Sequence, residues 1–412
     1  MKKKHFKRIL FLQIFFLVLV CQFNQSSIMA QGKSKTTVWV GSWACAQMLI
    51  EPNNMPPAPG LSRNTLRQII RVSIGGKHIR LRFSNIFSDQ QTVLKSVSVA
   101  NVIDAPGIDS KTQKELRFNG KSEITINPEQ EIYSDAFDFK LTPGQLLAIT
   151  IHYGNISQKT SGHPGSRTTS YILEGDQIQN AAFDGAIKTD HWYSIMGLDV
   201  VEDKSAAAIV CLGNSITDGR GSGTNKQNRW TDILSARLSA DKKTEKIGVL
   251  NLGIGGNCVV KGGLGPTALN RFDRDVLSQK GTKWLIILEG INDIGGIENP
   301  EDAPVKAQEL INAYKVMIDK AHAKAIKVYG CTILPFAKSF YDAPHKQQAR
   351  DIVNTWIRNS NAFDAVIDFD KVMVSGEDSK TILSSLHDGD FLHPNEAGYL
   401  KMGEAVDLNL FK

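Results

Sequence analysis

From Ser205 onward, short apolar runs alternate with segments of helical periodicity, and this rhythm restricts the fold more than any other feature of the sequence. The runs are rich in small and β-branched residues, as strands buried on both faces are. They lie at Ala206–Leu212, Ile247–Leu252, Trp284–Leu288, Lys327–Leu334 and Ala365–Phe369. Strand–helix alternation of this kind predicts a parallel sheet covered by helices on both faces.

The clearest helix between these runs covers Glu301–Lys324. Its apolar residues recur at helical spacing and form one stripe, which comprises Val305, Leu310, Ile311, Tyr314, Met317, Ile318 and Ala321. Pro300 precedes the helix, and Glu301 and Asp302 place negative charge at the positive end of its dipole. We therefore expect a helix that packs this stripe against the sheet.

The first half of the chain, from Thr36 to about Thr189, shows period-two alternation and little helical periodicity. Within residues 79–83 one face is apolar and the other basic, with Ile79, Leu81 and Phe83 opposed to Arg80 and Arg82. Similar runs, punctuated by Gly, Pro, Asn and Asp, recur at Gln68–Ile74, Leu94–Val102, Glu123–Ile126, Ala136–Leu141, Leu146–Tyr153 and Thr168–Leu173. Short strands with turns at this spacing predict an antiparallel sandwich of jelly-roll type.

A chain of 412 residues is long enough for two domains. We place an all-β sandwich (jelly-roll-like) accessory domain at residues 36–200 and an α/β domain at residues 205–412. We expect the passage between the two domains near residues 190–204. This segment ends in the charged triplet Glu202-Asp203-Lys204.

The first 30 residues have the pattern of a targeting segment. A basic stretch precedes a short apolar run at Ile9–Val20, and Ile28-Met29-Ala30 supplies a signal-peptidase site. The run is shorter than the ~20 residues of a membrane-spanning helix. We expect a cleaved signal peptide, residues 1–30, and an exported protein, periplasmic or extracellular, with no stable membrane span after cleavage. An uncleaved anchor and lipid attachment at Cys21 stay open, although the residues before Cys21 fit a lipoprotein box poorly.

The formal charge of +6 includes five basic residues of this leader, so the mature chain is near +1. A nearly neutral chain argues against a nucleic-acid partner. The remaining cysteines have no zinc-ligand spacing, and we interpret them as buried free thiols: Cys45, Cys211, Cys258 and Cys331. No metal and no cofactor is expected.

The nine residues Cys211-Leu-Gly-Asn-Ser-Ile-Thr-Asp-Gly219 place Ser215 on the turn that leaves the first strand of the α/β part. Open α/β sheets bind their ligands at the carboxyl ends of strands. Gly213 and Gly219 allow a sharp bend that presents the Ser215 hydroxyl away from the core. An ordinary Ser/Gly-rich strand-to-helix loop is the alternative.

Three further segments fall where they can meet Ser215. Residues 251–257 follow the second strand, residues 290–293 follow the third, and residues 390–395 precede the last helix. Because the carboxyl ends of neighbouring parallel strands lie at one edge of a sheet, these loops can converge.

Chemistry then assigns roles to individual side chains. Ser215 needs a base to become a nucleophile, and the His393 imidazole titrates near neutrality. Asp390, three residues earlier, can orient that imidazole, while a different register would substitute Asp388.

An oxyanion formed at an ester needs preorganised donors, which the N–H groups of Ser215 and Gly256 and the side-chain amide of Asn292 can supply. Gly256 has no Cβ to obstruct the substrate. Gly253 and Gly255 are the alternatives to Gly256.

In this order and at these strand ends, the four blocks resemble those of the SGNH (GDSL-type) hydrolases: Ser215 in Gly-Asn-Ser-Ile-Thr-Asp-Gly, Gly256, Asn292 in Gly-Ile-Asn-Asp, and His393 in Asp-Phe-Leu-His. The resemblance covers residues 205–412. It implies a flavodoxin-like three-layer α/β/α SGNH hydrolase domain with metal-free serine esterase chemistry, in which Ser215, Asp390 and His393 form the triad. Asn214 departs from the Asp that the family usually has before the nucleophile.

The β-rich first half and phrases around Arg271–Leu277 and Leu288–Gly295 are similar to secreted two-domain members grouped with xylan-active acetylesterases. This resemblance favours a small acyl group, most plausibly acetyl, on a carbohydrate or similar alcohol.

Other conspicuous residues receive structural interpretations. We expect His152 and His163 to be structural, His387 to be a loop histidine and His322 to lie at the surface. Glu289 either supports the backbone of the site or is an ordinary strand-end acid. Packing is also preferred for Arg229 and Trp230, and for the tryptophans Trp39 and Trp43, which could otherwise form a sugar platform with Arg80 and Arg82.

Three functions are compatible with these residues. A secreted serine esterase that hydrolyses a short acyl ester through an acyl-enzyme on Ser215 is favoured. An acyltransferase would use the same acyl-enzyme with a different acceptor, and a non-catalytic carbohydrate-binding protein would use the fold as a scaffold.

Overall fold

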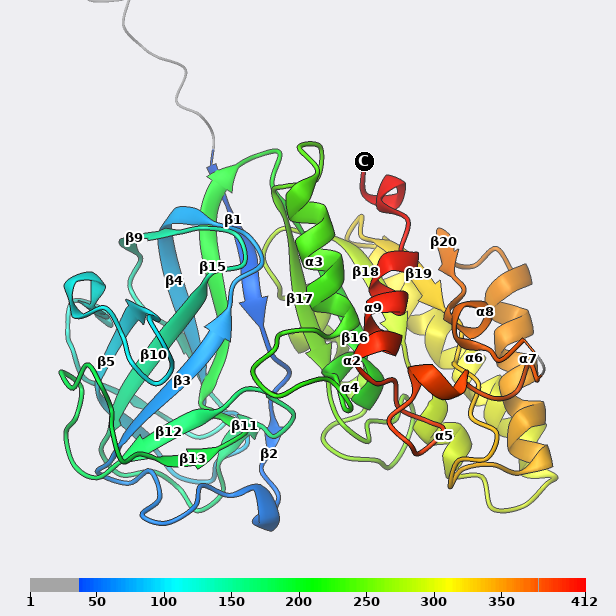
Figure 1. Ribbon diagram of the computed structural model, residues 1–412, viewed down its shortest axis with the longest axis horizontal. Coiled ribbons are helices and arrows are strands. Elements are labelled where there is room, and N and C mark those ends of the chain that lie inside the picture. Colours follow the sequence, from blue (N-terminus) through cyan, green and yellow to red (C-terminus); the bar gives the residue numbers. More distant parts are fainter. Residues whose placement is uncertain (1–36, 377) are drawn as a thin grey trace, which may run out of the picture. The chain divides into compact units, whose positions relative to one another are not determined.

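The computed structural model describes residues 37–376 and 378–412. The predicted signal peptide and Cys21 lie outside the described residues. The strands up to residue 203, here called the β region, pair antiparallel, whereas the strands from residue 207 onward, here called the α/β region, pair parallel (Figure 1). The mixed class predicted from the sequence is therefore confirmed. The division into separate domains at 36–200 and 205–412 stays a prediction.

Two antiparallel sheets and a smaller one form the β region. The first has the order β1-β15-β4-β8 with β9 beside β4, the second β13-β12-β3-β10-β5-β6 with β7 beside β5, and the third β14-β11-β2. Their bounds are β1 Thr37–Ala44, β2 Met48–Leu49, β3 Thr65–Arg71, β4 Gly76–Ser84, β5 Thr92–Asn101, β6 Lys114–Glu115, β7 Ile124–Ile126, β8 Glu131–Tyr133, β9 Phe137–Leu141, β10 Leu146–Tyr153, β11 Ser161–His163, β12 Ser170–Leu173, β13 Ile187–Thr189, β14 Trp192–Tyr193 and β15 Ile195–Asp203.

The two larger sheets bury their apolar faces in a shared core. From β4 the core receives the predicted residues Ile79, Leu81 and Phe83. The opposite, basic face of β4 is also covered. Arg82 on that face is only 3% exposed, and it donates a 3.0 Å hydrogen bond to Gln279 of the α/β region.

The expected passage at residues 190–204 is the largest error in the sequence-based organisation. Ile195–Asp203 is β15, which pairs antiparallel with β4 and also borders β1. Its charged end resembles a linker, but its first six residues are buried. Three residues separate β15 from β16, the first strand of the α/β region.

The parallel sheet has the order β17-β16-β18-β19-β20, so the first strand lies between the second and third as in flavodoxin-like folds. Its strands are β16 Ala207–Gly213, β17 Ile247–Gly253, β18 Thr282–Leu288, β19 Lys327–Cys331 and β20 Ala365–Ile367. The helices are α2 Ser215–Asp218, α3 Trp230–Ala240, α4 Ala268–Phe272, α5 Ile291–Gly295, α6 Asp302–His322, α7 Pro344–Asn359, α8 Phe369–Met373 and α9 Glu396–Ala405. Short 3-10 segments η1 Pro52–Asn54, η2 Ser110–Thr112, η4 Ser384–Leu386 and η5 Leu408–Phe411 and the π turn η3 Asp273–Leu277 complete the elements.

Helices cover both faces of this sheet (Figure 1). Alternate residues of the strands enter two clusters, one with α6 and α7 and the other with α3 and α9. The predicted stripe of α6 is buried except for Val305, which is 58% exposed. Val305 lies five residues before Leu310, about 140° around the helix, and so faces away from the sheet.

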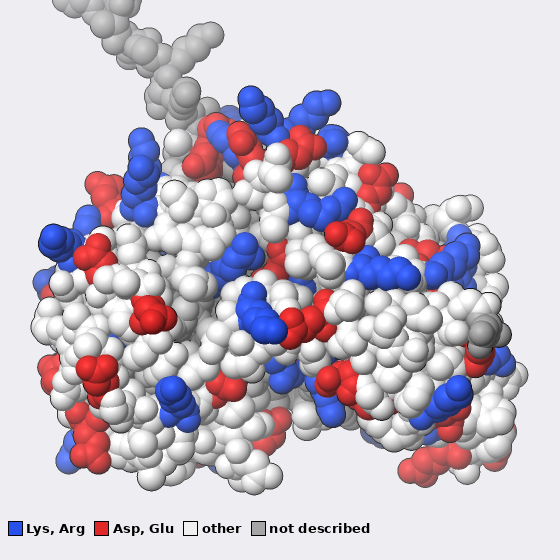
Figure 2. All heavy atoms as spheres, viewed as in Figure 1, with Lys and Arg blue, Asp and Glu red and all other residues white. Residues whose placement is uncertain are grey.

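Within the part of the chain that the structure describes, no helix is both long enough and apolar enough to cross a bilayer. On the face shown in Figure 2, basic and acidic side chains are interspersed rather than gathered into large patches of one sign.

Candidate active site

Ser215 is the first residue of α2, directly beyond the carboxyl end of β16. Asn214 caps this short helix by accepting the N–H of Ile216 at 3.1 Å. Gly219, at φ 106°, ends it, and the N–H groups of Gly219 and Arg220 both return to the Ser215 carbonyl. The predicted sharp turn is present, and a side chain at Gly213 would collide with Thr217.

His393 and Asp390 lie beside Ser215. The Ser215 Oγ is 2.8 Å from His393 Nε2, and His393 Nδ1 is 2.6 Å from Asp390 Oδ2. With its Nδ1 proton donated to Asp390, the imidazole presents Nε2 as the acceptor of the Ser215 hydroxyl proton. The three predicted side chains thus form one hydrogen-bonded line, while their catalytic roles stay predictions.

Electrostatics support these protonation states. Burial lowers the pKa of His393 below its ordinary value, although Asp390 opposes that change; Arg220 and Arg167 lower it further. Burial pushes the pKa of Asp390 up, but the hydrogen bonds from the His393 backbone and imidazole and from the Leu392 N–H outweigh it, so the net pKa is lowered. Because both pKa values are lowered, the His393 imidazole is favoured in its neutral form and the Asp390 carboxyl in its ionised form.

The alternative Asp388 does not reach the imidazole. Asp388 is exposed, and its backbone N–H donates to the His393 carbonyl. His387 accepts the N–H groups of Gly389 and Phe391 through Nδ1, which is the behaviour of a loop histidine.

Two of the predicted oxyanion donors are backbone N–H groups. Ser215 opens a helix, where the N–H lacks an intrahelical partner, and Gly256 adopts φ 69° in the loop after β17. Among the described residues neither N–H is satisfied by another protein group. The Gly253 N–H, in contrast, donates to Asn251 Oδ1 at 3.0 Å, which leaves Gly255 as the remaining alternative to Gly256.

Asn292, the third predicted donor, is held in α5 by two hydrogen bonds. Its Nδ2 donates to the Asn257 carbonyl at 2.8 Å, and its Oδ1 accepts the Tyr341 hydroxyl at 3.0 Å. The Tyr341 bond fixes which way the amide points, and one N–H remains for a substrate oxygen. Tyr341 was not among the residues predicted from the sequence.

Arg271 joins the strand ends beneath these loops. Its guanidinium donates to the carbonyls of Gly213 at 3.0 Å and Leu252 at 2.6 Å, and to Asn257 Oδ1 at 3.0 Å. Asp275 pairs with it at 3.1 Å, and both side chains are almost fully buried. One side chain therefore fixes the ends of β16 and β17 and the loop that carries Gly256.

Asn214, the departure from the family pattern, faces Glu289. Asn214 Nδ2 donates to Glu289 Oε2 at 3.2 Å, while Arg271 lies 3.5 Å from Glu289 Oε1. Burial raises the pKa of Glu289 to about 8, which Arg271 partly counters. Glu289 therefore supports the turn that carries Ser215, in agreement with the first of its two interpretations.

His163 of β11 is structural, as expected, but its partner was not predicted from the sequence. Its Nε2 lies 2.9 Å from Asp218, three residues after Ser215, and its Nδ1 lies 2.8 Å from the Ala46 carbonyl. Both partners are buried. The β region thus contacts the short helix that carries Ser215, through residues 55 positions apart that share no local pattern.

The remaining conspicuous residues are structural. Trp43 packs edge-to-face on Trp192, and Arg229 is buried with its Nε donating to the Asp218 carbonyl at 2.9 Å. Trp39 is stacked by Arg80, which pairs with Asp199, so these side chains do not form an open sugar platform. The four described cysteines are buried and unpaired.

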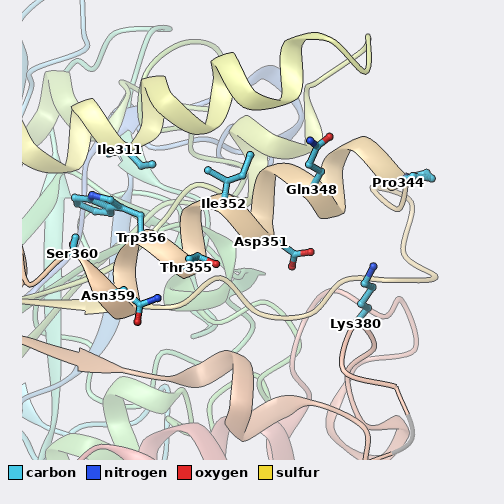
Figure 3. Close-up of a pocket in the computed structure, with 10 residues that line it drawn as sticks. All are labelled: Ile311, Pro344, Gln348, Asp351, Ile352, Thr355, Trp356, Asn359, Ser360 and Lys380. Atoms are coloured by element: carbon cyan, nitrogen blue, oxygen red, sulfur yellow. The ribbon is translucent and has the colours of Figure 1, made fainter.

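Two cavities differ in their relation to Ser215. A groove of about 750 Å³ runs along α7 beside α6 and is lined by Ile311, Trp356 and Lys380 among others (Figure 3). It contains none of the predicted site residues. A cavity of about 220 Å³ is lined by Asp218 and Gly255 of the site loops and by His163 and Arg167 of the β region.

Comparison with known proteins finds a family match and similar structures for the α/β region. Residues 211–401 match the GDSL-like Lipase/Acylhydrolase family. A GDSL-like lipase from Bacteroides thetaiotaomicron is 23% identical with a TM-score of 0.36, and the match covers 50% of this chain and 87% of that one. An acetylxylan esterase from Geobacillus stearothermophilus is 18% identical with a TM-score of 0.37, covering 48% and 93%.

A search among curated proteins finds no match. The family match spans every predicted site residue, from the strand before Ser215 to the helix after His393. Residues 211–401 therefore match the GDSL-like Lipase/Acylhydrolase family, and this match supports a carboxylic ester hydrolase.

Proposed function

We propose that this protein is an exported serine esterase that removes a short acyl group, specifically acetyl, from a carbohydrate or similar alcohol. The observation that carries the mechanism is the line from Ser215 through His393 to Asp390, with separations of 2.8 and 2.6 Å. Acetyl and carbohydrate are supported by the sequence resemblance to xylan-active acetylesterases. The polar lining of the 220 Å³ cavity, which includes Glu51, Asn54 and Arg167, suits a polyhydroxy alcohol better than a lipid chain.

In the first step the Ser215 Oγ attacks the ester carbonyl carbon while His393 Nε2 takes the hydroxyl proton. The N–H groups of Ser215 and Gly256 and the Asn292 amide receive the oxyanion, each such donor typically contributing on the order of 10²–10³ in rate. Collapse breaks the ester C–O bond, and His393 gives its proton to the leaving alcohol. Water then attacks the acyl-enzyme by the same route and releases the acid.

The test measures acetate and p-nitrophenol release from p-nitrophenyl esters of increasing acyl length. We expect wild-type rates to fall with chain length and the Ser215→Ala variant to lose the activity. Asp390→Asn is expected to lower kcat by several orders of magnitude, because it removes the negative charge that stabilises the imidazolium. Asp388→Asn is the matched control, since this exposed carboxylate does not touch the imidazole.

Equal rates of ester hydrolysis for wild type and Ser215→Ala would exclude Ser215 from the mechanism, provided that circular dichroism shows both proteins to be folded. A wild-type preference for long acyl chains would contradict the acetyl proposal. Mass spectrometry of an enzyme quenched during turnover should show a mass increase of one acetyl group on the Ser215 peptide. Added sugar acceptors distinguish hydrolysis from transfer, because a transferase would form acetylated acceptor at the expense of acetate.

A further inference from the structure

The cavity of about 220 Å³ lies against the loops of the candidate active site. One of its lining residues is Asp218, the last residue of the short helix that begins at Ser215. Another is Gly255, which directly precedes Gly256. Leu264 also lines the cavity, and its N–H donates to the Gly256 carbonyl at 3.0 Å. The cavity therefore borders both the helix of the candidate nucleophile and the loop of a predicted oxyanion donor.

Two side chains of opposite charge line this cavity from the β region, Glu51 and Arg167. The Nε of Arg167 is buried without a hydrogen-bond partner in the described part of the chain. Asp218 approaches this guanidinium to 3.9 Å only, and it already lies 2.9 Å from His163. Glu51 accepts the Asn54 amide at 3.0 Å through Oε2 and forms no ion pair with any cation of the described residues. The cavity thus contains a carboxylate and a guanidinium that are not paired with each other.

Both side chains extend from backbone that is held in place. Arg167 lies in the loop between β11 and β12 with φ 50°, and its carbonyl accepts the Asn225 N–H at 3.0 Å. Glu51 precedes η1, and its carbonyl accepts the Asn54 N–H at 2.9 Å. The Asn54 carbonyl in turn accepts the Tyr193 hydroxyl at 2.8 Å. Because these loops are ordered before a ligand arrives, binding between them costs little conformational entropy.

Unpaired charges of both signs favour a ligand that is neutral and carries hydroxyl groups. A hydroxyl can donate to the Glu51 carboxylate and accept from the Arg167 guanidinium. An anion would be repelled by Glu51 and Asp218, and a cation by Arg167. The cavity also has an apolar wall, to which Met48 and the 48% exposed Leu264 contribute. A wall of this kind with a few convergent polar groups fits a sugar ring, which has C–H faces and a hydroxyl edge.

We propose that this cavity binds an uncharged sugar ring in the alcohol part of the ester, with Glu51 accepting and Arg167 donating hydrogen bonds to its hydroxyl groups. The inference rests on the proposed esterase function, and it names the class of alcohol and two specificity-determining residues. The β region thereby selects the substrate, while the loops of the α/β region act on the ester bond.

The experiment compares methyl 3-O-acetyl-xylopyranoside with cyclohexyl acetate, whose alcohol has a ring of the same size without further hydroxyl groups. In Arg167→Met and in Glu51→Ala we expect the ratio of kcat/KM for the sugar ester to that for cyclohexyl acetate to fall about tenfold, mainly through KM, because a charge-assisted hydrogen bond is lost. Arg167→Lys should retain part of the ratio, since the ammonium can still donate. Arg63→Met is the matched control, because Arg63 is an exposed arginine with a similar backbone, at φ 62°, outside the cavity lining.

A ratio that stays at the wild-type value in both variants would overturn the proposal. Calorimetry of methyl xyloside with Ser215→Ala tests the cavity without catalysis. Binding that is lost when Arg167→Met is added would support the subsite even if the esterase function failed, whereas no binding to Ser215→Ala would contradict it. Tighter binding of methyl glucuronoside, which carries a carboxylate, would contradict the neutral class. Ser215-dependent cleavage with an unchanged ratio would leave the esterase standing and exclude only the sugar subsite.

Discussion

The imidazole of His163 in the β region lies 2.9 Å from the carboxylate of Asp218, three residues beyond Ser215. The same ring is 2.8 Å from the Ala46 carbonyl, so both of its nitrogens are engaged. Asp218 in turn donates its backbone N–H to the Asn214 carbonyl and accepts Arg229 at its own carbonyl. The short helix that begins at Ser215 is therefore held by a histidine outside the α/β region.

His163→Ala should lower the free energy of unfolding by about 3 kcal/mol, because it leaves the Asp218 carboxylate buried without its partner. We also expect a lower kcat for p-nitrophenyl acetate as the turn around Ser215 loosens. Denaturant unfolding and steady-state kinetics provide the measurements. His152→Ala is the control, since that half-buried histidine lies in β10 away from Asp218. Equal stability of the two variants would show that the contact contributes little.

The pH profile of kcat/KM should report the pKa of His393. The base acts in its neutral form, and burial with the two arginines lowers its pKa below the ordinary value, so activity should already be maximal near pH 7. Arg220→Gln removes a cation that disfavours imidazolium, which should raise the pKa and move the acidic limb to higher pH. Profiles from pH 4 to 9 on a neutral ester, with Arg63→Gln for comparison, measure the displacement. A shift to lower pH would contradict this electrostatic account.

Stability should fall as the pH rises from about 4.5 to about 8 on account of Glu289. Its pKa is raised to about 8 by burial, so the folded protein holds a proton that the unfolded chain releases above about 4.5. The loss amounts to at most about 1.4 kcal/mol per pH unit from this group. Urea unfolding of Glu289→Gln at pH 5, 6.5 and 8 should show a flatter dependence than wild type. The exposed Glu404→Gln should follow wild type, and an unchanged slope in Glu289→Gln would rule out this carboxyl as the source.

Arg271→Met should destabilise the protein by about 3 kcal/mol and abolish activity, since it removes one of the two arginines that pair with buried Asp275 and a hydrogen-bond donor from two strand-end carbonyls. Arg271→Lys should recover part of the stability but little activity, because one ammonium cannot reach all the groups that the guanidinium joins. Guanidinium chloride unfolding and ester hydrolysis test both expectations. Arg117→Met, at an exposed arginine of the β region, is the control.

The arrangement of the α/β region could be predicted because its signals are local. Apolar runs mark β16 to β20, and the residues of the candidate triad follow a strand end or stand three positions apart in one loop. The bonding partners of these residues also follow from chemistry, since a serine, a histidine and an aspartate at one edge of a sheet have few other ways to pair.

Features that depend on contacts between residues far apart in the sequence could not be predicted. Arg82 alternates as a solvent-facing residue would, yet the α/β region covers its face of β4. The charged end of β15 resembles a linker because only pairing with β4 and β1 reveals it as a strand. His163 and Arg167 carry no motif, and only folding brings them close to Asp218.

The short connection between β15 and β16 affects how a substrate can reach Ser215. Only three residues connect the two strands. Because β15 is paired on both sides in one sheet and β16 on both sides in another, this connection is too short to act as a hinge. The hydrogen bonds of Arg82 and His163 across the same boundary oppose sliding as well. A short connection between two paired strands therefore disfavours hinged opening between the two regions as the route by which substrates reach Ser215.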